Sequence, residues 1–234
     1  MRKIMLFISC LLIGTLAGAQ NTTDLTRNIT RAINEAQAEV LITVNWEKPV
    51  RLRDVMSRPP RMGANKNMIL RYDKKTTSCK GILTNTGKVV TPAVCVQDDD
   101  FTLKKLTMQF SNGNKEEGNS HSFFIKEDVA FVRVSAESVH GLAGIPVAKI
   151  PFGQTLHETF GDTVTAFLLN FFQRHGIHRH VRRGIGYTAR KPSLQVGDAV
   201  ILDGKLVALI RKVPHVYSTT FFGSAPEDPL AIVY

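Results

Sequence analysis

The histidines of this chain are the first residues that suggest chemistry, because some of them are closely spaced. Three of the seven lie close together, at His175, His178 and His180. On a β-hairpin the alternate residues His178 and His180 would share a face, and imidazole is a good ligand for transition metals. No cysteine or carboxylate completes a ligand set beside them, so we expect no metal site and no cofactor.

A second stretch whose residues suggest chemistry runs from Cys79 to Cys95, with a cysteine at each end. Between them, the β-prone runs at residues 81–84 and 88–91 flank Asn85-Thr86-Gly87. Asparagine and glycine tolerate the positive φ that a tight turn requires. This spacing predicts a β-hairpin with a cysteine at each end.

The start of the chain has the features of a secretory signal peptide. A basic pair precedes an apolar core that is too short to span a bilayer, and Ala17-Gly18-Ala19 supplies a small-residue cleavage site. We expect a signal peptide at residues 1–19, with cleavage between Ala19 and Gln20. A lipoprotein signal ending at Cys10 and a retained membrane anchor are the alternatives.

Cleavage changes both the cysteine count and the charge. It removes Cys10 together with two cations, which leaves two cysteines and lowers the formal charge from +10 to +8. A single pair in an exported protein predicts a Cys79–Cys95 disulfide, worth about 3 kcal/mol by loop-closure entropy, with two buried free thiols as the alternative. No stretch of the mature sequence approaches transmembrane length, so we expect a soluble secreted or periplasmic protein.

The cysteine hairpin resembles the trypsin/chymotrypsin family of serine proteases. Residues 89–95 read Val-Val-Thr-Pro-Ala-Val-Cys and are similar to the family's Val-Val-Thr-Ala-Ala-His-Cys, with the cysteine spacing preserved. The residue at the position of the catalytic histidine is Val94. An isopropyl group cannot accept a proton, so this position cannot supply the general base.

The other two triad positions follow from the same resemblance. Asp128 opens a run similar to the family's Asp-Ile-Ala-Leu-Leu-Lys-Leu and falls at the triad aspartate; without an imidazole to orient, we expect it to be a buried structural carboxylate. Gly197-Asp198-Ala199 stands where the family has Gly-Asp-Ser, which puts Ala199 at the nucleophile position. Bulky residues replace the glycines that follow, which disfavours even the oxyanion hole.

The resemblance implies an all-β fold of the chymotrypsin type, a double six-stranded β-barrel, preceded by a helical extension. Leu25, Ile29 and Ile33 recur at helical spacing, followed by a β-like run from Val40 to Trp46 and a proline- and arginine-rich connector at residues 48–66. The helix would dock on the body or bind a partner. Residues 161–166 are similar to the first strand of the second barrel. We divide the chain into a signal peptide (1–19), a helix and linker extension (20–66) and a degenerate trypsin-like domain (67–234).

A run without acidic residues between Asp162 and Asp198 carries a possible anion-binding ribbon. Its candidate residues are Arg174, Arg179, Arg182, Arg183 and Arg190. Such a ribbon would attract an anionic polymer, although a solvated hairpin explains it as well. Aromatic residues are not interleaved with these cations, and we expect no nucleic acid partner. Ser193 stands where the family has the base of its specificity pocket. The alternative is that it is an ordinary turn serine.

These observations favour a secreted, catalytically inactive homologue of the trypsin-like proteases that binds a protein or peptide. Two alternatives stay open. One is an active serine-type endopeptidase whose catalytic residues have moved elsewhere in the sequence. The other is a secreted adhesion or envelope module that uses the fold as a scaffold, since fold alone does not determine function.

Overall fold

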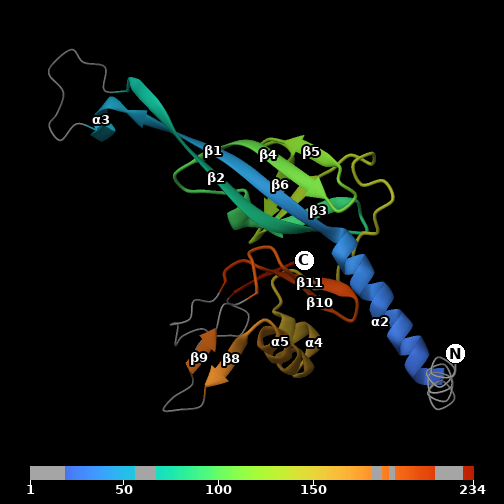
Figure 1. Cartoon of the computed structure of the whole chain (residues 1–234). Coiled ribbons are helices and arrows are strands. Elements are labelled where there is room, and N and C mark those ends of the chain that lie inside the picture. The colour runs from blue at the N-terminus through green and yellow to red at the C-terminus, as the bar shows by residue number, and fades with distance from the viewer. Residues whose placement is uncertain (1–18, 56–66, 181–185, 190–192, 214–228) are drawn as a thin grey trace, which may run out of the picture.

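The structure is a computed structural model that describes residues 19–55, 67–180, 186–189, 193–213 and 229–234. All but the last residue of the predicted signal peptide therefore lie outside the described residues. The first described element is helix α2 (Ala19–Ala38), which projects away from the rest of the molecule in Figure 1. Ile29 and Ile33 on this helix are half-exposed, so its apolar face is only partly covered. Of the helices in the described ranges, none has the length and apolar character of a membrane-spanning segment.

A curled seven-stranded sheet forms the larger half of the molecule (Figure 1). Its order is β5-β4-β1-β2-β3-β7-β6, and its neighbours pair antiparallel. The bounds are β1 Glu39–Arg51, β2 Ile69–Leu83, β3 Lys88–Pro92, β4 Thr102–Phe110, β5 Lys115–Gly118, β6 Phe123–Lys126 and β7 Val129–Arg133. The prediction of a β-rich, barrel-like fold preceded by a helix is confirmed.

Strand β1 lies between β4 and β2, and its sequence buries one face of the strand. Val40, Ile42, Val44 and Trp46 all point into the core, as the two-residue period of a half-buried strand requires. The strand continues to Arg51 and pairs with β2 along its whole length. The predicted connector at 48–66 is therefore wrong for its first four residues, which are strand. The short helix α3 (Leu52–Val55) follows.

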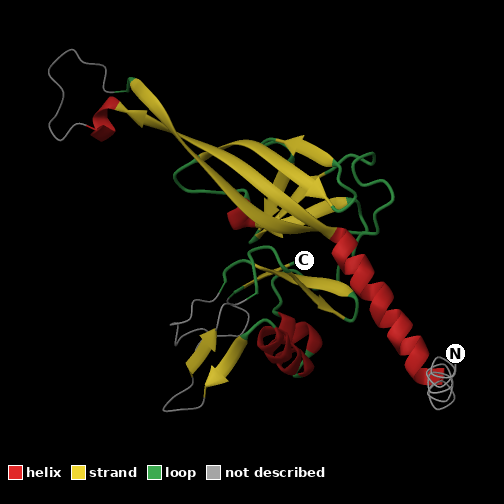
Figure 2. Ribbon diagram, in the orientation of Figure 1, coloured by secondary structure: helices red, strands yellow, loops and turns green. Residues whose placement is uncertain are grey.

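The smaller half of the molecule combines a three-stranded sheet with two helices (Figure 2). The sheet has the order β10-β11-β12, formed by Ala199–Leu202, Lys205–Ile210 and Leu230–Ile232. Beside it lie α4 (Leu156–Phe160) and α5 (Thr163–Arg174), and a two-stranded hairpin of β8 (Ile177–His180) and β9 (Gly186–Ala189) follows α5. Among the described residues the strands thus divide seven, three and two, where the family resemblance implied six and six.

The strand predicted at residues 161–166 is helical in the structure. Val164, Leu168 and Phe172 recur every four residues and are all buried, which is the signature of an amphipathic helix. The preceding helix α4 begins with a capping box, in which Thr155 and Glu158 satisfy each other's backbone amides. At these residues the helical spacing of the apolar side chains, and not the resemblance, indicates the correct secondary structure.

Strand β11 joins the two halves of the molecule. Leu206 and Leu209 pack in the core of the larger sheet, whereas Val207, Ala208 and Ile210 pack with α4 and α5. One strand therefore contributes to both cores, and the two halves share a buried boundary.

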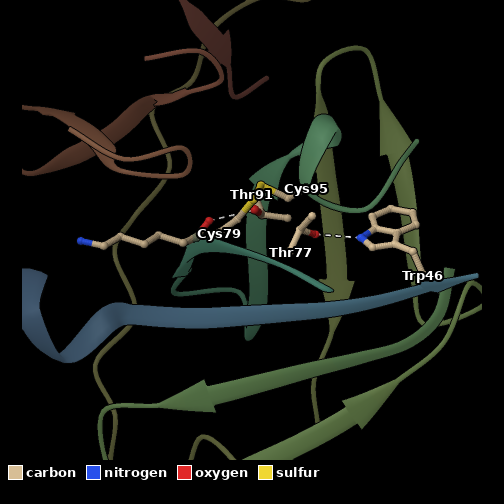
Figure 3. The surroundings of a disulfide bond; sticks show 6 residues. Trp46, Thr77, Cys79, Thr91 and Cys95 are labelled. Atoms are coloured by element: carbon tan, nitrogen blue, oxygen red, sulfur yellow. Dashed lines mark hydrogen bonds between the residues drawn. A yellow bond between two sulfur atoms is a disulfide. The ribbon is translucent and has the colours of Figure 1, made fainter. Parts of the chain in front are cut away.

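The predicted disulfide between Cys79 and Cys95 is confirmed and links β2 to the short 3-10 helix η1 (Ala93–Cys95). Figure 3 shows two hydrogen bonds beside it. The Thr91 hydroxyl donates to the Lys80 carbonyl oxygen at 2.8 Å, and the Trp46 indole N–H donates to the Thr77 hydroxyl oxygen at 2.7 Å. The predicted turn at residues 85–87 connects β2 to β3, with Gly87 at φ +71°.

Candidate functional site

Val94, which the resemblance puts at the position of the general base, lies on the surface. It is the middle residue of η1, between the buried Ala93 and Cys95, and is 58% exposed. The Ala93 amide donates to the backbone oxygen of Asp128 at 2.7 Å, which brings the aspartate turn beside Val94. The structure therefore places Val94 and Asp128, which the resemblance assigns to the triad, next to each other.

Asp128 lies in the two-residue turn between β6 and β7. Its carboxylate accepts a hydrogen bond of 2.5 Å from Nη1 of Arg211, just beyond the end of β11. The side chain of Asp128 is 57% exposed, so the expectation that it is buried is wrong. It is an exposed carboxylate paired with an arginine.

Ala199, which the resemblance puts at the nucleophile position, begins the edge strand β10 and pairs with Leu209. The turn before it is bonded to the end of β11: the Gly197 amide donates to the Ile210 oxygen at 2.7 Å, and the Ile210 amide donates to the Asp198 oxygen at 2.9 Å. Because Gly197 N–H already has an acceptor, it is not available to a substrate oxygen. The resemblance predicts this amide as one of the two of an oxyanion hole, and in the structure it is a hydrogen-bond donor to β11 instead.

The Gly197 turn also packs directly on β2. A Cβ built on Gly197 would lie 1.8 Å from the carbonyl oxygen of Lys80, far inside any allowed contact. The Lys80 amide donates to the Val196 oxygen at 2.9 Å, and its ammonium lies 3.0 Å from both Asp198 and Glu39. Partial burial lowers the pKa of Lys80, but hydrogen bonds to Asp198 and Glu39 outweigh it and raise the pKa above its usual value. We call Gly197, Asp198 and Lys80 the inter-sheet joint.

A cleft of about 520 Å³ opens beside Ala199. It lies between α2, α5 and β10, and its walls include Arg31, Phe171, Arg174 and Ala199. Arg31 donates to the Ile201 oxygen at 3.3 Å, so α2 reaches the edge of β10. The cleft is large enough for a few side chains of a bound peptide. Its walls combine apolar side chains with groups of both charges, because Glu35 and Asp203 line it together with Arg31 and Arg174, and Arg31 pairs with Glu35.

A histidine and a serine meet at the rim of this cleft, a pairing that the sequence did not reveal. Nδ1 of His175 lies 2.8 Å from Oγ of Ser193, and the Ser193 amide donates to the His175 oxygen at 3.3 Å. Burial lowers the pKa of His175, while the nearby Asp198 opposes this shift, so the neutral imidazole is favoured. The β8–β9 hairpin leaves the body after His175 and brings the chain back close to Ser193, which is why residues 18 positions apart become neighbours.

Two other sequence candidates fall mostly outside the described side chains. For the anion-binding ribbon, Arg174 is exposed at the end of α5, whereas Arg182, Arg183 and Arg190 lie outside the described residues, as does the side chain of Arg179. The side chains of His178 and His180 are likewise outside them. Among the residues that the structure does describe, no group of three histidine, cysteine or acidic side chains could hold a metal ion.

Comparison with known proteins finds similarity only at the level of structure. No family model matches the sequence, and no curated protein matches it. Among solved structures, the chain is similar to an "HtrA-type protease AlgW with decapeptide", with 10% identity, a TM-score of 0.38 and coverage of 81% of this chain and 59% of that one. A substituted variant of the same protease, also with decapeptide, gives 9% identity, a TM-score of 0.44 and coverage of 82% and 59%. The chain thus spans 59% of the length of these proteases. With TM-scores below 0.5, these similarities assign neither an activity nor a site to this chain.

Proposed function

We propose that this chain is a secreted, catalytically inactive relative of the trypsin-like serine proteases that acts by binding a protein or peptide. The observation that carries the proposal is the set of side chains at the triad-equivalent positions. Val94 and Ala199 have hydrocarbon side chains, and Asp128 is paired with Arg211 instead of an imidazole. Triad members act as a unit, so either hydrocarbon replacement alone would remove nearly all hydrolysis.

The hydrogen bonding and packing of the Gly197 turn support this proposal independently of the side chains at the triad-equivalent positions. An inactive protease that retained its oxyanion hole would still stabilise negative charge on a bound carbonyl. Here the Gly197 amide donates to Ile210, and the glycine itself packs on the Lys80 backbone. The Gly-Asp pair therefore has a structural role in the inter-sheet joint, which accounts for its presence without catalysis.

Export and partner binding follow from charge and covalent structure. A disulfide persists in oxidising compartments, which agrees with the predicted signal peptide at residues 1–19. The mature chain would carry a formal charge of +8, which favours acidic partners, including an anionic polymer. The cleft beside Ala199 is the proposed place for a peptide segment.

A second candidate function is serine hydrolysis by His175 and Ser193. Their hydrogen bond of 2.8 Å, together with the lowered pKa of His175, is the arrangement that activates a hydroxyl nucleophile. The carboxylate that would orient the imidazole is engaged elsewhere, because Asp198 accepts from the Gln195 amide at 2.6 Å and pairs with Lys80. This pair therefore lacks the third group that makes such sites efficient, and we favour binding over hydrolysis.

A fluorophosphonate probe distinguishes the two candidates. The purified mature protein is incubated with the probe beside active trypsin, and adducts are read by intact-protein mass. We expect no adduct on the wild-type protein. An adduct that maps to Ser193 and disappears in both Ser193→Ala and His175→Ala would replace the binding proposal with the hydrolase.

A further inference from the structure

Strand β6 is an edge of the seven-stranded sheet. It is the last strand in the order β5-β4-β1-β2-β3-β7-β6, and three of its four residues, Phe124, Ile125 and Lys126, are exposed. The opposite edge, β5, reads Lys-Glu-Glu-Gly and is charged, the usual protection against unwanted strand pairing. The edge at β10 receives Arg31 of α2 on its Ile201 oxygen. The edge at β6 reads Phe-Phe-Ile-Lys, so it is mostly apolar and Lys126 at its end is its one charged residue.

The register of the β6–β7 hairpin shows which backbone groups of β6 face outward. Lys126 pairs with Val129 across the two-residue turn, and Ser122 accepts from the Arg133 amide at 2.9 Å at the other end. Bonded and non-bonded pairs alternate in an antiparallel ladder, so the N–H and C=O of Phe123 and Ile125 point away from β7. Neither residue bonds through its backbone to any other described residue outside the ladder. They offer two donors and two acceptors to an added strand.

Side chains along this edge form two rows of different chemistry. Phe123 and Ile125 lie on the face of the core, where Phe123 packs against buried residues and Ile125 is 38% exposed. We call them the apolar row. An added strand would place every second side chain beside this row, which favours aliphatic residues at those positions.

The opposite face carries aromatic rings and cations, which we call the cationic row. Phe124 stacks on Phe131 with ring centroids 4.9 Å apart, and the ammonium of Lys88 lies 5.4 Å from the Phe124 ring. The ammonium of Lys126 lies 4.6 Å from the ring of Phe152, which is 63% exposed. Neither lysine forms an ion pair with another described residue, and the rings hold both cations near the edge.

We propose that the free edge of β6 binds an extended peptide segment in which acidic and apolar residues alternate. Main-chain bonds to Phe123 and Ile125 hold the segment as an additional strand. Its acidic side chains lie beside Lys88 and Lys126, and its apolar side chains lie beside the apolar row. This surface is separate from the cleft beside Ala199, so the proposal stands whether or not that cleft is catalytic.

The probe that tests this proposal is a fluorescein-labelled peptide with four Glu-Val repeats, and its matched control has Lys in place of every Glu. Binding to the mature protein is measured by fluorescence anisotropy at low salt. We expect saturable binding of the Glu-Val peptide and at least about tenfold weaker binding of the Lys-Val peptide, which meets like charge. Equal binding of both peptides, or no binding of the Glu-Val peptide, overturns the proposal.

Two further variants test the main-chain bonds and the cationic row separately. Ile125→Pro removes an outward N–H without breaking a β6–β7 bond, and Ile125→Ala is its control. We expect a loss of about five- to tenfold for the proline and a smaller change for the alanine. The double variant Lys88→Glu with Lys126→Glu should reverse the peptide preference. Retained affinity in the proline variant, or an unchanged peptide preference in the double variant, contradicts the proposal.

A modified peptide keeps the test decisive if Ile125→Pro destabilises the fold. Two versions of the Glu-Val peptide are N-methylated, one on all glutamates and the other on all valines, and both are measured with the wild-type protein. An added strand bonds through alternate residues, so one version should lose binding and the other should keep it. Equal affinity for the two versions would overturn strand addition.

Discussion

Replacing Gly197 with alanine would place a methyl group against the backbone of β2. The new Cβ would lie 1.8 Å from the carbonyl oxygen of Lys80 and 2.4 Å from its carbonyl carbon, so the turn and the strand must separate by more than an ångström. Separation loosens the hydrogen bond from the Lys80 amide to the Val196 oxygen and the ion pair of Lys80 with Asp198. The substitution therefore disrupts the contacts of the inter-sheet joint directly.

The expected cost has two parts that can be separated by a matched control. Gly197 has φ +94°, and an alanine in a left-handed conformation costs about 1–2 kcal/mol. The loosened hydrogen bond and ion pair add about 2–3 kcal/mol, because both groups are partly buried. Gly87 has φ +71°, yet nothing lies within 4 Å of its Cβ, so Gly87→Ala has only the conformational cost. We expect Gly197→Ala to be less stable than Gly87→Ala by about 2–3 kcal/mol.

Urea unfolding followed by tryptophan fluorescence measures this difference. Trp46 is the single tryptophan of the chain and is 2% exposed in the core of the larger sheet, so its emission reports global unfolding. The disulfide is kept intact, and m-values are compared to ensure that both variants unfold in the same way. If Gly197→Ala is no less stable than Gly87→Ala, the close packing of the turn on β2 is refuted, and the structural role assigned to the Gly-Asp pair fails with it.

Three further predictions concern stability. Reducing the disulfide, which closes a loop with a sequence separation of 16, should lower the unfolding free energy by about 3 kcal/mol; a midpoint in urea that does not move on reduction would contradict this. Asp128→Asn should cost less than about 1 kcal/mol because its ion pair is exposed, and a loss of several kcal/mol would show that Asp128 is structurally critical after all. The pKa of His175 is lowered in the folded state, so its contribution to stability is fully present above its ordinary pKa of 6.5 and is lost as the pH falls through the folded pKa. As the pH is lowered, the urea midpoint should therefore fall more steeply in the wild type than in His175→Gln. Parallel curves for the two proteins would contradict the lowered pKa of His175.

Local turn chemistry explains why the central hairpin was predictable. Asn85-Thr86-Gly87 specifies a tight turn, the flanking runs are β-prone, and the cysteines end up with Cα atoms 5.9 Å apart, within the range that a disulfide spans. The same reasoning succeeded for helix α2, whose apolar residues recur at helical spacing. In each case the information lies within a single stretch of chain.

Predictions failed where the outcome depends on distant packing or on an analogy. The resemblance predicts a strand at residues 161–166, although Val164, Leu168 and Phe172 carry the helical period of α5. The exposure of Asp128 depends on how the β6–β7 turn meets Arg211, which lies 83 positions away. The pairing of His175 with Ser193 depends on the return of the chain after a hairpin, and the sequence signal for it is the pair of β-prone runs between the two residues.

Cleavage of a complex peptide mixture is the most direct test of the proposal that this protein has no hydrolytic activity. The mature wild-type protein and its Ser193→Ala variant are incubated with peptides from a digested proteome, and new termini are counted by mass spectrometry. We expect the same background of new termini with the wild type, with the variant and with buffer alone. Termini that share a sequence preference, appear with the wild type and vanish in the variant would contradict it.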